Sequence, residues 1–90
     1  MDILDKITQA RPTFSKGQKR IADFITSHTD KAAFMTAAKM GATVGVSEST
    51  VVRFAYELGF GGYPELSRAL QQVIKTQLTS VQRIAVTQDR

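Results

Sequence analysis

The chain contains no cysteine among its 90 residues, which excludes disulfides and thiolate chemistry and fits a reducing compartment. It has one histidine, His28, and without cysteine this is too few of the usual nitrogen and sulfur ligands to predict a metal site. No apolar run approaches the ~20 residues that a membrane helix needs. The N-terminus also lacks the cationic start and apolar core of a signal peptide. We therefore expect a cytoplasmic protein that does not contact a membrane.

Patterns of strands and of catalysis are missing too. No segment alternates apolar and polar residues for long enough to predict a strand. Gly59, Gly61 and Gly62 lack the lysine and following Ser or Thr of a phosphate-binding P-loop, and His28 has no evident nucleophile as a partner. We expect neither enzymatic activity nor a cofactor.

Positive charge is in mild excess, with a net charge of +4 and a sequence pI near 9.8. Part of this excess is local, because Arg11, Lys16, Lys19 and Arg20 precede the next acid, Asp23. Such a bias suits a polyanionic partner but does not establish one. Lys16, Lys19 and Arg20 either neutralise nucleic-acid phosphates or form a solvated helix face.

Apolar spacing predicts helices over about 3–10, 16–28, 37–44 and 48–58, a short helix near Ala33, and a last helix from Pro64. Arg11 before Pro12 should end the first helix, because a residue before proline disfavours the α region. Ser15 and Gln18 form the pattern of a capping box, and Thr29 or Asp30 should cap the short helix. The expected fold is an all-α, compact bundle of five to six helices in one domain.

Residues 37–56, AAKMGATVGVSESTVVRFAY, have the pattern of two short helices joined by a tight turn. Gly45 falls where the chain must turn, often at positive φ, and Gly41 falls where the two helices should approach most closely. Thr36 and Ser47 are the expected N-caps of the two helices. This combination predicts a homeodomain-like helix-turn-helix. Gly59 should end the second helix in a Schellman motif.

The second motif helix has two faces of different chemistry. One is an apolar stripe, and the other carries Ser49, Arg53 and Tyr56, flanked by Val52. Such a helix fits the major groove of B-DNA, where Arg53 can bond guanine and Val52 can pack on a thymine methyl. Ser49 and Tyr56 can bond bases or phosphates, and Glu48 can accept from a cytosine amine.

Each of these side chains also has a simpler interpretation. Arg53 can pair with Glu57 at i+4, Tyr56 and Val52 can form a protein contact, and Ser47 is first a structural cap. In the company of the motif we favour the DNA interpretation for Arg53.

The run GVSESTVVRFAYELGFGGYPEL at 45–66 resembles the signature of RpiR-type bacterial transcription regulators, roughly VSxxTVxRFxxxLGFxGFxEF, and the resemblance covers about residues 1–77. It implies DNA contacts by Ser47, Ser49, Thr50 and Arg53. Tyr63 and Leu66 depart from it, because the family more often has phenylalanine there. The resemblance also implies a C-terminal SIS domain that binds phosphorylated sugars, which 90 residues cannot contain. We expect residues 1–78 to be the DNA-binding domain and 79–90 a helix end or linker.

The sequence therefore predicts a sequence-specific, double-stranded DNA-binding domain of a regulator of sugar or amino-sugar phosphate metabolism, acting as a homo-dimer or higher oligomer. A sugar-phosphate effector would act only through the missing domain. The alternative is a protein-interaction module on the same scaffold, and RNA binding is less favoured. The backbone contacts are expected from a set of hydroxyl and basic side chains: Thr36, Ser47, Thr50, Lys16, Lys19 and Arg20.

Overall fold

The computed structural model describes residues 2–88, and side chains for residues 2–76. It contains six α-helices and one 3-10 helix, and no strand among the described residues. The helices are α1 (Ile3–Ala10), α2 (Lys16–Ser27), α3 (Thr29–Ala32), α4 (Ala37–Val44), α5 (Glu48–Glu57) and α6 (Tyr63–Gln88), with η1 (Arg11–Thr13) directly after α1. The prediction of an all-α bundle of five to six helices is confirmed.

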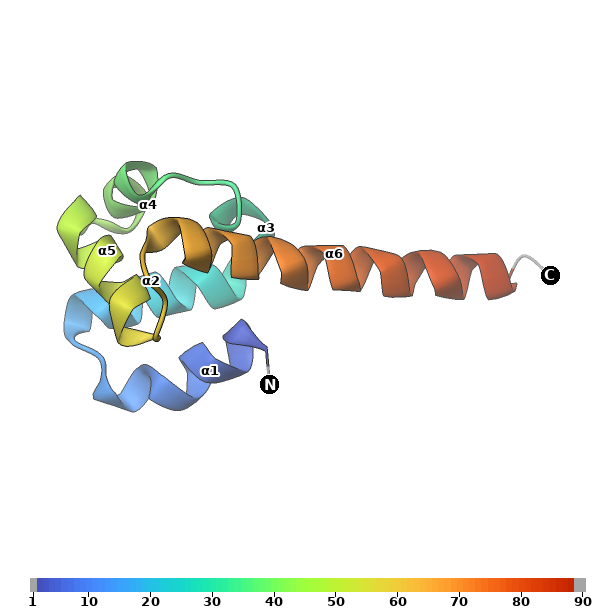
Figure 1. Ribbon diagram of the computed structural model, residues 1–90, viewed down its shortest axis with the longest axis horizontal. Helices are drawn as coiled ribbons and strands as arrows, with labels where there is room; N and C mark the ends of the chain where they lie inside the picture. The colour runs from blue at the N-terminus through green and yellow to red at the C-terminus, as the bar shows by residue number, and fades with distance from the viewer. Residues whose placement is uncertain (1, 89–90) are drawn as a thin grey trace.

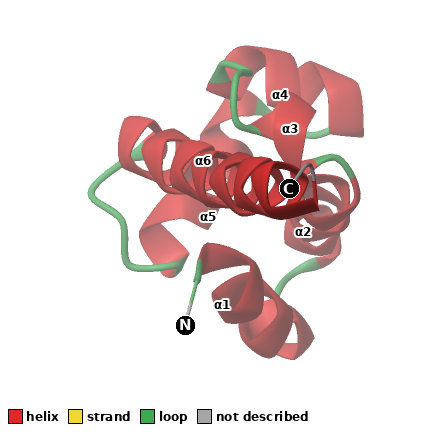
Figure 2. Cartoon of the chain, turned by 90° about the vertical axis from the view of Figure 1, so that its right-hand side faces the viewer, coloured by secondary structure: helices red, strands yellow, loops and turns green. Residues whose placement is uncertain are grey.

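The helices form a globule from which α6 projects (Figure 1). The long axis measures 50 Å and the other two 24 and 22 Å. Viewed along α6, the other helices lie around its first half (Figure 2), and α6 contacts α1, α3 and α5. The helix-turn-helix pair, α4 and α5, lies at the end of the molecule away from the C-terminus (Figure 1).

One apolar core joins these helices. Its largest fully buried side chains come from five of the six α-helices and include Phe54, Ile7, Ile21, Met40 and Leu66. The rings of Phe14 and Phe54 lie 5.1 Å apart between centroids, which ties the segment before α2 to α5. Each such side chain contributes about 1.5–3 kcal/mol when it leaves water, so packing rather than helix propensity fixes where α5 sits.

The start of α2 carries the predicted capping box. Ser15 Oγ accepts a hydrogen bond from the Gln18 N–H at 3.3 Å, and Gln18 Oε1 accepts from the Ser15 N–H at 2.9 Å. These two bonds satisfy donors that the first turn of a helix otherwise leaves without partners. The helix they begin ends at Ser27, one residue before the predicted end.

Of two predictions about helix ends, one is confirmed and the other, the cap of α3, is wrong. The first helix ends at Ala10, directly before Arg11, as predicted. The reason differs, because Arg11 stays in the right-handed α region (φ −50°, ψ −42°) and the chain tightens into η1, where Pro12 is tolerated. Arg11 also forms a bidentate ion pair with Asp23, at 2.8 and 3.0 Å. No side chain caps α3; Thr29 donates instead to the carbonyl of Ile25 at 2.8 Å.

Long-range hydrogen bonds hold α6 against the segment that follows α3. The Tyr63 hydroxyl donates to the carbonyl of Met35 at 2.7 Å, and Ser67 and Gln71 both donate to that of Ala33. Burial raises the pKa of Tyr63. The helix begins at Tyr63 rather than at Pro64. The segment predicted as a helix end or linker, 79–90, lies outside the residues whose side chains are described, so the domain division stays a prediction.

Candidate nucleic-acid interface

The turn between α4 and α5 depends on two glycines. Gly45 has φ +82°, a conformation that only glycine adopts without steric cost. The carbonyl of Gly41 accepts from the N–H groups of Gly45 and Val46, both at 2.9 Å. A Cβ on Gly41 would lie 2.8 Å from the carbonyl oxygen of Val46. Both glycine predictions are confirmed, and the turn fixes the angle at which α5 leaves α4.

Hydroxyl groups gather at the start of α5. Ser47 caps the helix by accepting from the Thr50 N–H at 3.1 Å. Its Oγ also lies 2.8 Å from the Thr50 hydroxyl and 3.1 Å from that of Ser49. They lie at the positive end of the helix dipole, which favours a negative group. The predicted cap at Ser47 is confirmed.

The outer face of α5 carries the three side chains expected there. Ser49, Arg53 and Tyr56 are exposed, and Tyr56 keeps 55% of its surface in water. Val52 is half-buried against the core on one flank. Arg53 Nη2 lies 3.5 Å from the Thr50 hydroxyl and forms no ion pair with Glu57 in the described part of the chain. The guanidinium is therefore available to a partner.

The far end of α5 closes as a Schellman motif, as predicted. Gly59 has φ +93°. Its N–H donates to the carbonyl of Tyr56 at 2.9 Å, and the Phe60 N–H donates to that of Ala55 at 3.1 Å. Lys6 lies over the Phe60 ring at 5.4 Å from its centroid. These contacts stop α5 one turn beyond Arg53 and keep the exposed face short.

The start of α2 packs against the turn before α5. A Cβ on Gly17 would lie 3.3 Å from Val46 Cγ1 and 3.8 Å from Thr50 Cγ2, so the missing side chain allows the close approach. Arg20 Nη1 lies 4.0 Å from where a Cβ on Gly45 would be. Lys16, one turn earlier, is exposed. The basic face of α2 thus adjoins the turn that leads into α5.

The basic residues of α2 are not equivalent. The hydrogen bond from Arg11 is the main reason that the pKa of Asp23 lies below its usual value, and the charge of Lys19 adds to the same effect. Lys19 is half-buried and forms no ion pair in the described part of the chain, whereas Arg20 is exposed and lies by the turn. Thr36 caps α4 by accepting from the Lys39 N–H at 3.1 Å, at the end of α4 away from the turn. Glu48 is exposed in the first turn of α5.

A groove of about 550 Å³ separates the first turn of α2 from α5. It is lined by side chains and backbone of both segments: Ser15, Gly17, Gln18, Val46, Ser47, Thr50, Arg53 and Glu57. Sequence reasoning assigned Gln18 only a capping role and gave Gly17 none. The one local signal in the sequence was Gly17 itself, because a glycine in the first turn of a helix lets another segment approach closely.

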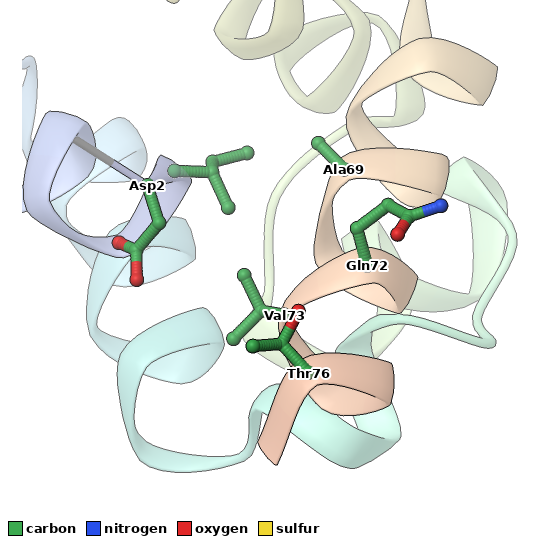
Figure 3. Close-up of a pocket in the computed structure, with 6 residues that line it drawn as sticks. Asp2, Ala69, Gln72, Val73 and Thr76 are labelled. Atoms are coloured by element: carbon green, nitrogen blue, oxygen red, sulfur yellow. The ribbon is translucent and has the colours of Figure 1, made fainter. Parts of the chain in front are cut away.

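Two other hollows lie beside α6. The first, about 400 Å³, lies between Asp2 on the α1 side and Ala69, Gln72, Val73 and Thr76 on α6 (Figure 3). The second, about 360 Å³, lies beside Phe34, whose side chain is 72% exposed. The lining of the second also includes Arg68, Lys75 and two glutamines. Neither hollow is lined by a residue of α5.

The residues that the structure describes contain neither a membrane-spanning helix nor a cluster of metal ligands. No helix among them is both long and apolar enough to cross a bilayer. No group of three or more His, Cys, Asp or Glu side chains is placed there to hold an ion.

Comparison with known proteins places the arrangement in a family context. Residues 1–77 match the helix-turn-helix domain of the rpiR family. The chain is 32% identical over 77 residues to a protein of Escherichia coli (strain K12) named "Uncharacterized HTH-type transcriptional regulator YfhH". That alignment covers 86% of this chain and 27% of the relative, so the chain spans about a quarter of the length of the curated relative that it matches.

Proposed function

This chain belongs to the rpiR family of helix-turn-helix domains, and we propose that it reads a specific sequence of double-stranded DNA for a bacterial transcriptional regulator. DNA binding by a regulator follows from the family and from the similarity to an HTH-type transcriptional regulator. The observation that carries sequence reading is the exposed face of α5. It presents Ser49, Arg53 and Tyr56 to solvent beside the basic start of α2.

In the proposed complex α5 enters the major groove. Arg53 donates two hydrogen bonds to guanine, the commonest specific contact at this kind of interface. Val52 packs on a thymine methyl from the flank, while Ser49 and Tyr56 bond base edges or phosphates. Glu48 accepts from a cytosine amine. The short exposed face of α5 limits one domain to a few base pairs.

The surrounding hydroxyl and basic groups hold the DNA backbone in this proposal. Ser47 and Thr50 offer hydroxyls at the positive end of α5, and Lys16 and Arg20 supply charge from α2. Thr36 contacts a phosphate at the start of α4. Lys19, which is half-buried on the same helix, adds a third positive charge. Such contacts set position and affinity but carry no sequence information.

At the level of the whole regulator, we propose control of sugar or amino-sugar phosphate metabolism in the cytoplasm. The effector would be a phosphorylated sugar bound by a C-terminal SIS domain, through which it would act on this one. Because dimers read two half-sites, a two-fold protein would recognise a palindromic operator. The apolar faces of α1 and α6 are candidates for a contact between two copies.

Selection of bound sequences from random duplex DNA tests the proposal, followed by titration of the winning duplex against salt. We expect a recovered consensus and an affinity that falls steeply as salt rises, because phosphate contacts release counterions. Binding to no duplex, with or without the rest of the regulator, would contradict DNA reading. An apolar protein partner held with little salt dependence would then favour the interaction-module alternative.

A further inference from the structure

We propose that the groove between α2 and α5 holds one phosphate of the DNA backbone, and that the amide nitrogen of Gln18 donates a hydrogen bond to it. This inference rests on the proposed DNA binding and adds to it a defined subsite and a residue that the sequence assigned only to helix capping. The argument starts from the fixed orientation of the Gln18 side chain.

Gln18 is held in one orientation by its capping role. Its Oε1 accepts from the Ser15 N–H at 2.9 Å, so the oxygen of the amide is identified by its partner and the Nε2 group must point the other way. The residue is 9% exposed, which makes it the one buried polar residue among those described. A carboxamide restrained in this way has little freedom to turn toward another partner.

The amide nitrogen of Gln18 keeps some contact with solvent, and Gln18 lines the groove. Nε2 takes part in none of the hydrogen bonds among the described residues. In that part of the chain no side-chain nitrogen or oxygen is fully buried without a partner. The small exposed part of Gln18 therefore includes Nε2, and the hollow that Gln18 lines is the α2–α5 groove. A fixed, outward-directed N–H pair favours an acceptor that fits the groove.

The groups around this nitrogen suit an anion. Ser47 and Thr50 line the same groove, and their hydroxyls can donate to a phosphate oxygen. Arg53 lines it as well and adds a positive charge. The N-terminus of α5, a ten-residue helix, adds its positive dipole end. The one acid in the lining is Glu57, two turns further along the helix than Thr50.

The position of the groove favours backbone phosphate over a base edge. Thr50 and Glu57 lie on the flank of α5 that faces α2, beside the outermost stripe of Ser49, Arg53 and Tyr56. When the outer stripe points into a major groove, its flank meets the wall of that groove, where the phosphates lie. Gly17 brings α2 close enough to form the second side of the subsite.

The test replaces Gln18 by Glu in the complete 90-residue chain. Glutamate keeps the acceptor that the capping box needs but exchanges the outward N–H group for a carboxylate oxygen. We expect affinity for the selected duplex to fall about tenfold or more, as a donor to a charged group is replaced by a like charge. Gln72→Glu on α6 is the matched control, because it makes the same change of charge. Its affinity for the duplex should fall much less.

A second variant predicts the opposite change. Glu57→Gln removes the one acid of the groove without altering its size, and we expect tighter binding by about twofold to fivefold at low salt, because a surface like-charge contact is removed. Unchanged or weaker binding by this variant would contradict a phosphate in the groove.

A scan of the duplex with single neutral methylphosphonate linkages locates the phosphate. At one position, the neutral linkage should weaken binding of the duplex by the original protein but not by the Gln18→Glu variant. The losses in binding free energy from the linkage and from the substitution should therefore not be additive. The subsite would be overturned, with DNA binding left intact, if two results were found together. Gln18→Glu and Gln72→Glu would bind the duplex equally well, and the effect of every neutral linkage would simply add to that of Gln18→Glu. Failure of the unaltered chain to bind any duplex would instead overturn the proposed function together with the subsite.

Discussion

The groove between α2 and α5 and the hollow between α1 and α6 are of comparable size but differ in chemistry. The first presents the amide of Gln18, the hydroxyl of Thr50 and the guanidinium of Arg53. The second is walled largely by apolar groups, including Ile3 and Val73 (Figure 3). Unlike this hollow, the α2–α5 groove therefore offers several donors to an anion, and it lies at the end of the molecule away from the projecting helix (Figure 1). Concavity alone does not indicate a site here, but the chemistry of the lining does.

The two regions are also held in place differently. The α4–α5 end is held by interactions between residues close in sequence. Gly45 adopts the left-handed conformation, and each of the two helices is capped by a side chain that accepts from an N–H three residues later. The first half of α6 is fixed by hydrogen bonds that join residues far apart in sequence, such as Tyr63 to Met35 and Ser67 to Ala33. Substitutions at matched positions in the two regions should separate these effects.

The largest expected effect follows Gly41→Val. A Cβ at Gly41 would lie 2.8 Å from the backbone oxygen of Val46, which cannot move without separating α4 from α5. We expect a loss of about 3 kcal/mol in the free energy of unfolding, typical of severe overpacking. Gly61→Val is the control: its Cβ would meet a Glu65 oxygen also at 2.8 Å, but that carboxylate can rotate away. Urea unfolding measures both, and equal losses would refute this distinction.

The next effect concerns recognition rather than folding. Arg53→Ala should weaken binding to the selected duplex by about 1–3 kcal/mol and reduce the preference for one base pair, if Arg53 reads guanine. Arg68→Ala removes the same charge from an exposed position on α6 and should leave that preference unchanged. Titrations against the selected duplex and single-base-pair variants measure the difference. Retained specificity in Arg53→Ala would remove this residue from the reading set.

Gly45→Val should have a moderate effect on stability. Gly45 is exposed, so a valine side chain there would contact few other atoms. The strain would come instead from the backbone of residue 45, which has φ +82°. We expect a loss of about 1–2 kcal/mol, the typical penalty for an L-residue in the left-handed region. Gly45→Asn should lose less, because asparagine tolerates this region. Thermal unfolding followed by circular dichroism compares the two, and identical melting temperatures would argue against backbone strain.

The smallest effect is on salt dependence. Arg20→Ala should reduce the slope of log affinity against log salt by about one, as expected for the loss of one phosphate contact. Arg11→Ala should change the slope less, because Arg11 forms its bidentate pair with Asp23 at 2.8 and 3.0 Å. Titrations at four or more salt concentrations provide the slopes. A larger change for Arg11 than for Arg20 would reverse our assignment of the basic face.

Local features were predictable because they depend on neighbouring residues. The caps at Ser15, Thr36 and Ser47 each join a side chain to an N–H three residues away, a spacing that is visible in the printed sequence. The turn at Gly45 and the Schellman ending at Gly59 follow from glycine at a helix terminus. For the same reason the exposed and buried faces of α5 were predicted correctly from helical periodicity.

Some partners were not visible in the sequence pattern. Arg11 belongs to a local excess of positive charge, and the structure pairs it with Asp23, twelve residues later. The expected cap at Thr29 failed because the preceding helix ends so close that its Ile25 carbonyl takes the hydroxyl.

By itself the sequence determined the helices, the turn between α4 and α5, and the side chains on the outer face of α5, because each depends on contacts within about one helical turn. Tertiary structure alone decided that the start of α2 lies beside α5. It thereby placed Arg20 at the turn, and it left Gln18 lining a groove. The physical reason is that these relations depend on the close approach at Gly17 and on one shared apolar core, and both join residues some thirty positions apart.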